Sequence, residues 1–311
     1  MASNSKLLSR EVRDLQLKSN MSVAELVEQM GESGGFTSQH LADGVNIMRG
    51  MLADKECARF FSFPACIVST GLRGAIAQHV KDFSAIITTC GTLDHDLARA
   101  WGGKYFCGAF ELDDEKLHKE GVNRLGNILI PNASYGETLE NGMNPILKEL
   151  AAQKEEWGGR ELIHEFGKRV KDEHSILYQA AKHNVPIYVP GITDGAFGTN
   201  LVLFSQDKKF KLNILKDEKE ISDIVYDSKK TGALMIGGGI SKHHTIWWNQ
   251  FKGGLDYAVF ITTASQYDGS LSGARLTEAV SWGKIKEKAR YVTIDGDATV
   301  LLAVMLAALE K

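Results

Sequence analysis

A lysine near the end of the chain stands in a setting that suits covalent chemistry. The segment 267–284 runs from Tyr267 through a stretch rich in Gly and Ser to Trp282 and Lys284. Most lysines in helices are surface charges, but burial beside an aromatic ring disfavours the ammonium form. Such a lysine can attack a carbonyl or imine carbon. The spacing therefore makes Lys284 a candidate nucleophile.

Two adjacent histidines follow a triple glycine at the start of a predicted helix, 242–251. Neighbouring helix residues point about 100° apart, so His243 and His244 cannot both face one metal ion. We expect one of them to enter a site while the other packs. A lone histidine is usually structural, but His243 follows Gly237-Gly238-Gly239 closely, which makes it a better candidate. No metal site is predicted.

A possible phosphate-binding element lies earlier in the chain. Ser69-Thr70-Gly71 follows the apolar segment 65–68, interpreted as a strand, and opens a predicted helix, 72–80. Free amides at a helix start can face an anion. The serine could equally be only an N-cap. The GxGxxG and Walker spacings are both absent, so no classical nucleotide motif is present.

Short apolar runs ending in Gly, Thr, Ser or Asp provide the elements that would position these residues. Each run is too short for a helix and lacks period-2 alternation, as expected for strands buried on both faces of a parallel sheet. The predicted strands are 85–89, 128–130, 187–190, 233–236, 257–261 and 291–294. The predicted helices between them include 72–80, 141–154, 163–170, 175–183 and 242–251. This alternation indicates an α/β fold.

The repeated polar strand ends favour a cofactor-sized site. In open α/β sheets, ligands bind beyond the carboxyl ends of the strands. One Gly-rich strand end is ordinary turn chemistry, whereas five or six in one chain can surround a cofactor. No linker divides the chain, so we predict a small helical N-terminal segment, residues 1–51, followed by one domain, residues 52–311.

Composition excludes several other classes of protein. The 311 residues are 43% hydrophobic and 24% charged, with 36 basic against 39 acidic side chains, which argues against bulk-charge binding to nucleic acid. The longest apolar run, 298–309, is shorter than the roughly 20 residues of a membrane-spanning helix, and indicates a buried C-terminal helix. Because no secretory signal is evident, we expect a cytoplasmic protein with no membrane partner.

Several longer strings resemble the deoxyhypusine synthase family. These are Gly237-Gly238-Gly239 through His243-His244, Asp256 to Val259, and Asp268-Gly269-Ser270 through Ser281-Trp282-Gly283-Lys284-Ile285, with Asn123 to Asn127, Pro131-Asn132 and Thr193-Asp194-Gly195 before them. The resemblance runs from about Gly35 to the C-terminus. It implies a Rossmann-like α/β domain and a homotetramer with its sites at the interface of two subunits.

The resemblance also implies a reaction. Family members use NAD to oxidise spermidine, hold the aminobutyl group as an imine on a lysine, and pass it to a lysine of the translation initiation factor 5A precursor. Lys284 would be that lysine and His243 would assist proton transfer. Substrate-binding positions would be Asp94, His95, Gly269, Ser270, Glu278 and Trp282. Cofactor-binding positions would be Ser69, Thr89, Cys90, Gly91, Asp194, Gly238, Thr263, Ala264, Asp268, Asp297 and Ala298.

The chain departs from the family at three acidic places. Leu271 and Thr199 stand where acids are common, and Asp94-His95 replaces a glutamate pair. Each lost carboxylate removes a partner for a polycationic amine. Transfer to a free diamine, as in homospermidine synthase, and use of another donor are therefore alternatives. A third alternative, a non-catalytic NAD-binding subunit, would be expected to have lost the lysine, and Lys284 is present.

Overall fold

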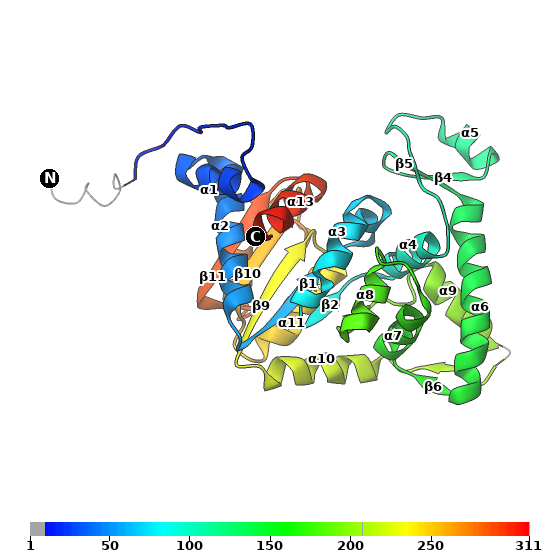
Figure 1. Cartoon of the computed structure of the whole chain (residues 1–311). Coiled ribbons are helices and arrows are strands. Elements are labelled where there is room, and N and C mark those ends of the chain that lie inside the picture. Colours follow the sequence, from blue (N-terminus) through cyan, green and yellow to red (C-terminus); the bar gives the residue numbers. More distant parts are fainter. Residues whose placement is uncertain (1–9, 207, 311) are drawn as a thin grey trace.

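Six parallel strands form the central sheet of the chain, in the order β11-β10-β9-β1-β2-β7 (Figure 1). The computed structural model describes residues 10–206 and 208–310. The strands are β1 (Cys57–Ser62), β2 (Ala85–Ile87), β7 (Ile187–Tyr188), β9 (Lys230–Ile236), β10 (Leu255–Thr262) and β11 (Ile285–Asp295). The chain moves outward from β1 through β2 to β7, then returns to β9 on the other side of β1 and continues to β10 and β11. This doubly wound order confirms the predicted Rossmann-like α/β fold.

Helices cover both faces of this sheet. One face packs against α2 (Phe36–Ala53), α3 (Leu72–His79), α8 (Ile176–His183) and α13 (Ala298–Leu309). The other packs against α10 (Leu215–Asp227), α11 (Gly239–Gln250) and α12 (Leu276–Ser281). Neighbours such as Phe60 and Phe61 are both fully buried but belong to different cores. The strands lack polar alternation because both faces are covered.

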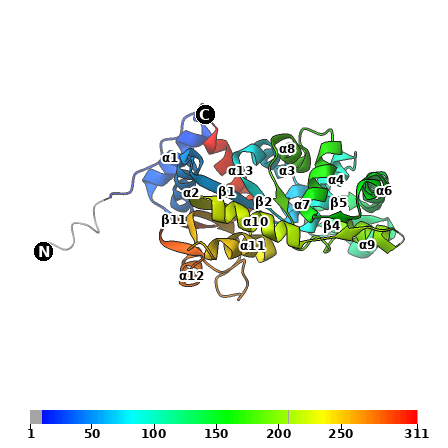
Figure 2. The same ribbon diagram turned by 90° about the horizontal axis from the view of Figure 1, so that it is seen from below.

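The crossover from β2 to β7 carries a large insertion at one end of the molecule (Figures 1 and 2). It contains α4 (Cys90–Ala100), α5 (Asp114–Lys119), α6 (Gly136–Gln153), α7 (Gly159–Arg169) and the antiparallel strands β3 (Phe106–Cys107), β4 (Val122–Leu125) and β5 (Ile128–Pro131). These three strands, in the order β3-β5-β4, are called the small sheet below.

Two expected strands are placed differently by the structure. Residues 128–130 belong to β5 of the small sheet, not to the parallel sheet, because Gly126 has a φ of +61° and closes a two-residue hairpin with β4. The apolar segment 65–68 lies in a 3-10 helix, η1 (Ala65–Ser69), where a strand was expected. Pro64 precedes it, and the strand that feeds this turn is β1, six residues that the pattern did not single out.

The remaining elements complete the layers. They are α1 (Val23–Ser33), α9 (Ala196–Gln206), the parallel pair β6 (Glu156–Trp157) and β8 (Lys211–Leu212), and the 3-10 turns η2 (Val80–Asp82) and η3 (Asn132–Ser134). The C-terminal helix α13 is confirmed and its inner side chains are buried. No helix in residues 10–206 and 208–310 is both long and apolar enough to span a membrane. The division at residue 51 stays a prediction.

Candidate active site

The backbone of Lys284 is fixed between a helix end and the edge of a strand. Gly283, with a φ of +67°, donates its N–H to the carbonyl of Val280 (2.9 Å), and Lys284 donates to the carbonyl of Ala279 (2.9 Å). These two bonds form a Schellman end for α12. The carbonyl of Lys284 accepts from the N–H of Leu255, the first residue of β10 (3.1 Å). The lysine side chain therefore starts from a rigid point.

A cavity of about 330 Å³ receives this side chain. We call it the Lys284 cavity. Lys284 is 9% exposed, and its Nζ lies 5.4 Å from the ring centre of Trp282 and 5.7 Å from that of Trp247. The lining residues come from α11, α12 and the loop before α12: Lys242, His243, Ile246, Trp247, Leu271, Ala274, Arg275, Glu278, Ala279, Trp282 and Lys284. Lys284, His243, Trp282 and Glu278 are thus brought together.

Two lysines line this cavity, and their contacts distinguish them. Lys242 is 2% exposed, and its Nζ donates to the carbonyls of Leu271 (2.8 Å) and Ala274 (2.7 Å), 3.6 Å from the ring centre of Phe260. Burial lowers the pKa of Lys242 to about 8, although its ammonium is held by these contacts. The structure shows no hydrogen-bond acceptor for Lys284 Nζ among the described residues. Lys284 is the lysine free to react.

His243 lies on α11 and lines the same cavity as Lys284. Its ring centre is 5.4 Å from that of Trp247, which follows it by one helical turn. Partial burial, and then the charge of Lys284, lower the pKa of His243. The neutral imidazole can therefore accept a proton near pH 7. His244 instead faces α10, where its Nε2 lies 3.6 Å from a carboxylate oxygen of Glu218, as expected for the histidine that packs.

The loop 265–275 closes over the start of α11. Asp268 Oδ1 accepts from the N–H (2.7 Å) and hydroxyl (2.6 Å) of Ser270, and these bonds lower the pKa of Asp268. Gly238 lets the loop backbone approach the turn after β9 closely, since a Cβ at this position would lie 2.2 Å from Cα of Ser272. Gly269 has a φ of +71° at the exposed tip. This loop therefore rests directly on the turn after β9.

The expected cofactor residues gather along the carboxyl edge of the parallel sheet. The edge has its topological switch between β1 and β9, where a Cβ on Gly237 would lie 3.5 Å from the Pro64 ring. Loops that diverge at such a point leave a crevice for a dinucleotide. The following positions lie after the strands of this edge: Ser69, Thr89, Cys90, Gly91, Asp194, Gly238, Thr263, Ala264, Asp268, Asp297 and Ala298.

Some of these side chains already have partners within the fold. Ser69 Oγ donates to the carbonyl of Cys66 (2.7 Å), and Thr89 Oγ1 accepts from the N–H of Ala65 (3.2 Å). Asp297 accepts from the N–H of Thr299 (3.0 Å) and caps α13. Asp194 is exposed beyond β7. The exposed carboxylates can accept hydrogen bonds from ribose hydroxyls, and the small residues let backbone N–H groups approach a pyrophosphate. No cluster of metal-ligating side chains occurs among the described residues.

Asp94 and His95 lie on α4, away from the Lys284 cavity. Asp94 is 1% exposed and accepts from the hydroxyl of Tyr135 (2.9 Å) and the N–H groups of Ala196 (3.0 Å) and Phe197 (2.7 Å). Burial raises the pKa of Asp94, and these bonds oppose the rise. Its oxygens therefore cap α9. His95, unlike Asp94, lines a second cavity.

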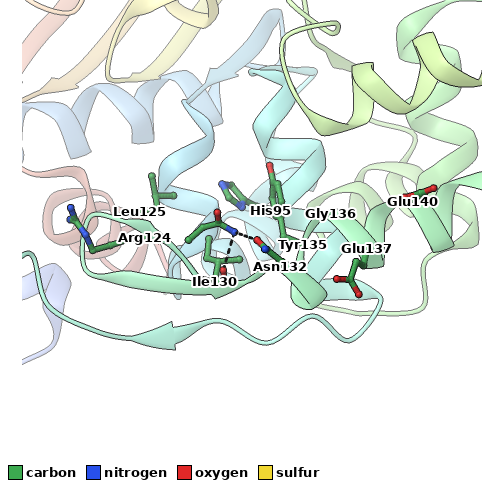
Figure 3. A pocket seen from close by; sticks show the side chains of 10 residues that line it. His95, Arg124, Leu125, Ile130, Asn132, Tyr135, Gly136, Glu137 and Glu140 are labelled. Carbon is green, nitrogen blue, oxygen red and sulfur yellow. Dashed lines mark hydrogen bonds between the residues drawn. The ribbon is translucent and has the colours of Figure 1, made fainter. Parts of the chain in front are cut away.

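This second cavity, of about 580 Å³, lies under the small sheet (Figure 3). We call it the small-sheet cavity. It is lined by residues of α4, β4, β5 and α6: His95, Asn123, Arg124, Leu125, Ile130, Asn132, Tyr135, Gly136, Glu137 and Glu140. It shares no lining residue with the Lys284 cavity. The two lie toward opposite ends of the molecule, near α12 and near α6 and β4 (Figure 2).

Comparisons with known proteins show the family of the chain. The family model "Deoxyhypusine synthase" matches residues 25–309. The chain belongs to the deoxyhypusine synthase family. It is 53% identical over 304 residues to a "Probable deoxyhypusine synthase" of Thermoplasma acidophilum, covering 97% of both chains, and 51% identical to one of Sulfurisphaera tokodaii, covering 97% of this chain and 98% of the other. The family, transferase class and cofactor NAD expected from the sequence are confirmed.

A solved structure shows the same fold. A crystal structure described as "a putative deoxyhypusine synthase" from Entamoeba histolytica superposes with a TM-score of 0.67 at 19% identity, covering 96% of each chain. At that identity the likeness concerns the fold alone. The layered α/β architecture of this deoxyhypusine synthase family member is therefore shared with a solved structure.

Leu271 and Thr199, the two positions where this deoxyhypusine synthase family member lacks an expected acid, lie in different places. Leu271 lines the Lys284 cavity. Thr199 lies on α9, donates to the carbonyl of Gly195 (3.0 Å) and lines neither cavity. Several residues that line the cavities were not predicted from the sequence. Trp247 could have been found, because it stands four residues after His243 and so shares its helix face. Nothing in the local pattern marked Lys242, Glu137 or Glu140.

Proposed function

We propose that Lys284 carries the aminobutyl group from spermidine to a lysine of the translation initiation factor 5A precursor. The main support for this proposal is that Lys284 Nζ lies beside two indole rings with no hydrogen-bond acceptor among the described residues. Lys242 Nζ, in contrast, is hydrogen-bonded to backbone carbonyls. Bound NAD supplies a hydride acceptor and later the hydride donor. Trp247 and Trp282 provide apolar walls for the four methylenes, and Glu278 provides a carboxylate for an ammonium.

The chain's own groups account for the transfer steps. Lys284 Nζ attacks the imine carbon of the oxidised donor, and the C–N bond to the departing diamine breaks as that nitrogen takes up a proton. The acceptor lysine then attacks the imine carbon on Lys284, and the bond to Lys284 Nζ breaks. His243 is placed to exchange the protons, because its neutral ring lies in the same cavity.

We further propose that two copies complete one site, within the expected homotetramer. His95 and Lys284 cannot meet within one chain, because they line separate cavities. The Lys284 cavity is also lined by exposed aromatic side chains, with Trp282 at 67% and Trp247 at 40%. Such a surface is typical of an interface. A cytoplasmic location belongs to the same proposal, since the acceptor acts where proteins are made.

One incubation tests the reaction. The enzyme is given NAD, spermidine labelled in its aminobutyl carbons, and either the factor 5A precursor or putrescine. We expect released 1,3-diaminopropane and labelled precursor protein. Label found only in homospermidine would assign the free-diamine alternative. Absence of both products, with NAD bound, would contradict aminobutyl transfer by this chain.

Mixing two inactive variants tests the shared site. Lys284→Arg and His95→Ala are each expected to lack transfer, and random pairing of the two should restore about a quarter of the wild-type rate in a two-fold dimer unit. Each mixed pair would contain one intact site. No recovery after subunit exchange, verified by native mass spectrometry, would show that each chain holds its own site.

A further inference from the structure

The small-sheet cavity presents acids that the reaction described above does not use. We propose that Glu137 and Glu140 bind the terminal ammonium of the donor amine in this cavity. This inference rests on the proposed function, because the amine must reach Lys284 of a second copy at its other end. The two glutamates thereby become specificity-determining residues for an alkylammonium ligand.

The two acids share one face of α6 and are unpaired. Glu137 lies in the first turn and Glu140 follows three residues later, so both point toward the same side of the helix. Both are exposed and line the cavity (Figure 3). Neither has an ion-pair or hydrogen-bond partner within residues 10–206 and 208–310. The one cation of the lining, Arg124, is engaged elsewhere, since its Nε and Nη2 each lie 2.7 Å from Asp114.

A buried imidazole points to the same class of ligand. His95 is 8% exposed, and its Nδ1 lies 2.8 Å from the hydroxyl oxygen of Tyr105. Its Nε2 has no partner in the part of the chain that the structure describes, and its ring lines the cavity (Figure 3). Burial, and then the charge of Arg99, lower the pKa of His95 to about 4. In the tautomer with a proton on Nδ1, Nε2 can accept a hydrogen bond from an ammonium.

The walls of the cavity suit an aliphatic chain. Leu125 and Ile130 from the small sheet provide apolar surface, while the acids lie on the α6 side. An alkylammonium can bury its methylenes on such walls and keep its charged end at a carboxylate. The Lys284 cavity is less suited to this end, since Lys242 and Lys284 face a single acid, Glu278, while Arg275 is paired with Asp295.

A double variant with a matched control tests the inference. Glu137→Gln combined with Glu140→Gln removes both charges, and Glu115→Gln removes an acid from the first turn of α5 outside the cavity. We expect the KM for spermidine to rise about tenfold in the double variant, as for one lost charge-assisted hydrogen bond. The kcat, the Kd for NAD and the unfolding midpoint should stay close to wild type. The control should change none of these values.

Acetylated amines identify the end that is bound. Inhibition constants are measured for spermidine carrying an acetyl group on one or the other terminal nitrogen. One of these two compounds should inhibit the wild type and the double variant equally, because it lacks the ammonium that the glutamates bind. An unchanged KM for spermidine, or a tenfold loss for both compounds, would overturn the inference. A wild-type enzyme that releases no diamine would instead contradict the proposed function.

Discussion

The two cavities of this chain differ in charge and in origin. The Lys284 cavity contains one acid and three cations, of which Arg275 is paired with Asp295, and is walled by two indoles. The small-sheet cavity contains a neutral imidazole and two acids without a partner among the described residues, and its one cation is already bound to Asp114. The small-sheet cavity is therefore the better suited of the two to an ammonium group.

The two cavities are built by different parts of the fold. The Lys284 cavity is built by α11, α12 and the loop before α12, on one face of the parallel sheet. The small-sheet cavity is built by the insertion between β2 and β7. We therefore expect the covalent chemistry to depend on the layering of the parallel sheet, and selectivity for the amine to reside in the insertion.

The largest expected effect comes from Lys284→Arg. Transfer should fall by at least about a thousandfold, since a guanidinium stays protonated and cannot form an imine. Binding of NAD, measured by calorimetry, should persist. Borohydride should trap an aminobutyl adduct on the wild type. An undiminished adduct on the variant would locate the nucleophile elsewhere.

A second expected effect concerns the small-sheet cavity and pH. The folded-state pKa of His95, about 4, lies below its unfolded value of about 6.5, so the unfolded chain binds more protons between these values. The contribution of His95 to the free energy of unfolding should be fully present above pH 6.5. It should fall by up to about 3 kcal/mol as the pH drops toward 4. His95→Gln should flatten this dependence in urea unfolding. An equally steep dependence of stability on pH in this variant would show that other groups cause it.

Lys242→Met should have a smaller effect, on the loop of the Lys284 cavity. The variant keeps the apolar stem but leaves the carbonyls of Leu271 and Ala274 without their donor, at a cost of roughly 1–3 kcal/mol. We expect a lower unfolding midpoint and reduced turnover, while borohydride still traps the adduct on Lys284. Loss of the adduct with NAD binding intact would show that Lys242 takes part in imine formation.

The smallest expected effect comes from restoring an acid. Leu271→Asp adds a second carboxylate to the Lys284 cavity and should lower the KM for spermidine by about fivefold to tenfold, as one partly exposed charge-assisted hydrogen bond would. Thr199→Asp serves as the control, because Thr199 lines neither cavity. Equal changes in both variants would mean that overall charge, not the cavity, sets the affinity.

Sequence reasoning predicted the Lys284 cavity better than the small-sheet cavity, for a physical reason. Five of the six expected runs became strands of the parallel sheet, because burial on both faces imposes a continuous apolar pattern. Residues 128–130 have the same pattern in a half-exposed hairpin, so composition alone could not distinguish the two sheets. Only the turn at Gly126-Asn127 gave a signal, which the sequence analysis did not use.

The residues around Lys284 were also easier to predict than the surroundings of Asp94. Glu278, Trp282 and Lys284 lie within seven residues of one another, and His243 joins them because α11 and α12 cover the same face of the sheet. Asp94 was expected at the substrate, but its bonds to Tyr135 and to the start of α9 join segments about 40 and 100 residues away. Pairings at such separation depend on how the insertion packs, which no local pattern encodes.

The contact between Gly238 and Ser272 has a consequence for how this enzyme can be altered. Gly238 has no room for even a methyl group, so we expect no other residue to be tolerated there. A library randomised at this position should yield inactive clones. Leu271, which precedes Ser272 in the chain, is 38% exposed and lines the Lys284 cavity. A position with no room for a side chain thus lies beside one where we expect substitutions to alter the range of donors.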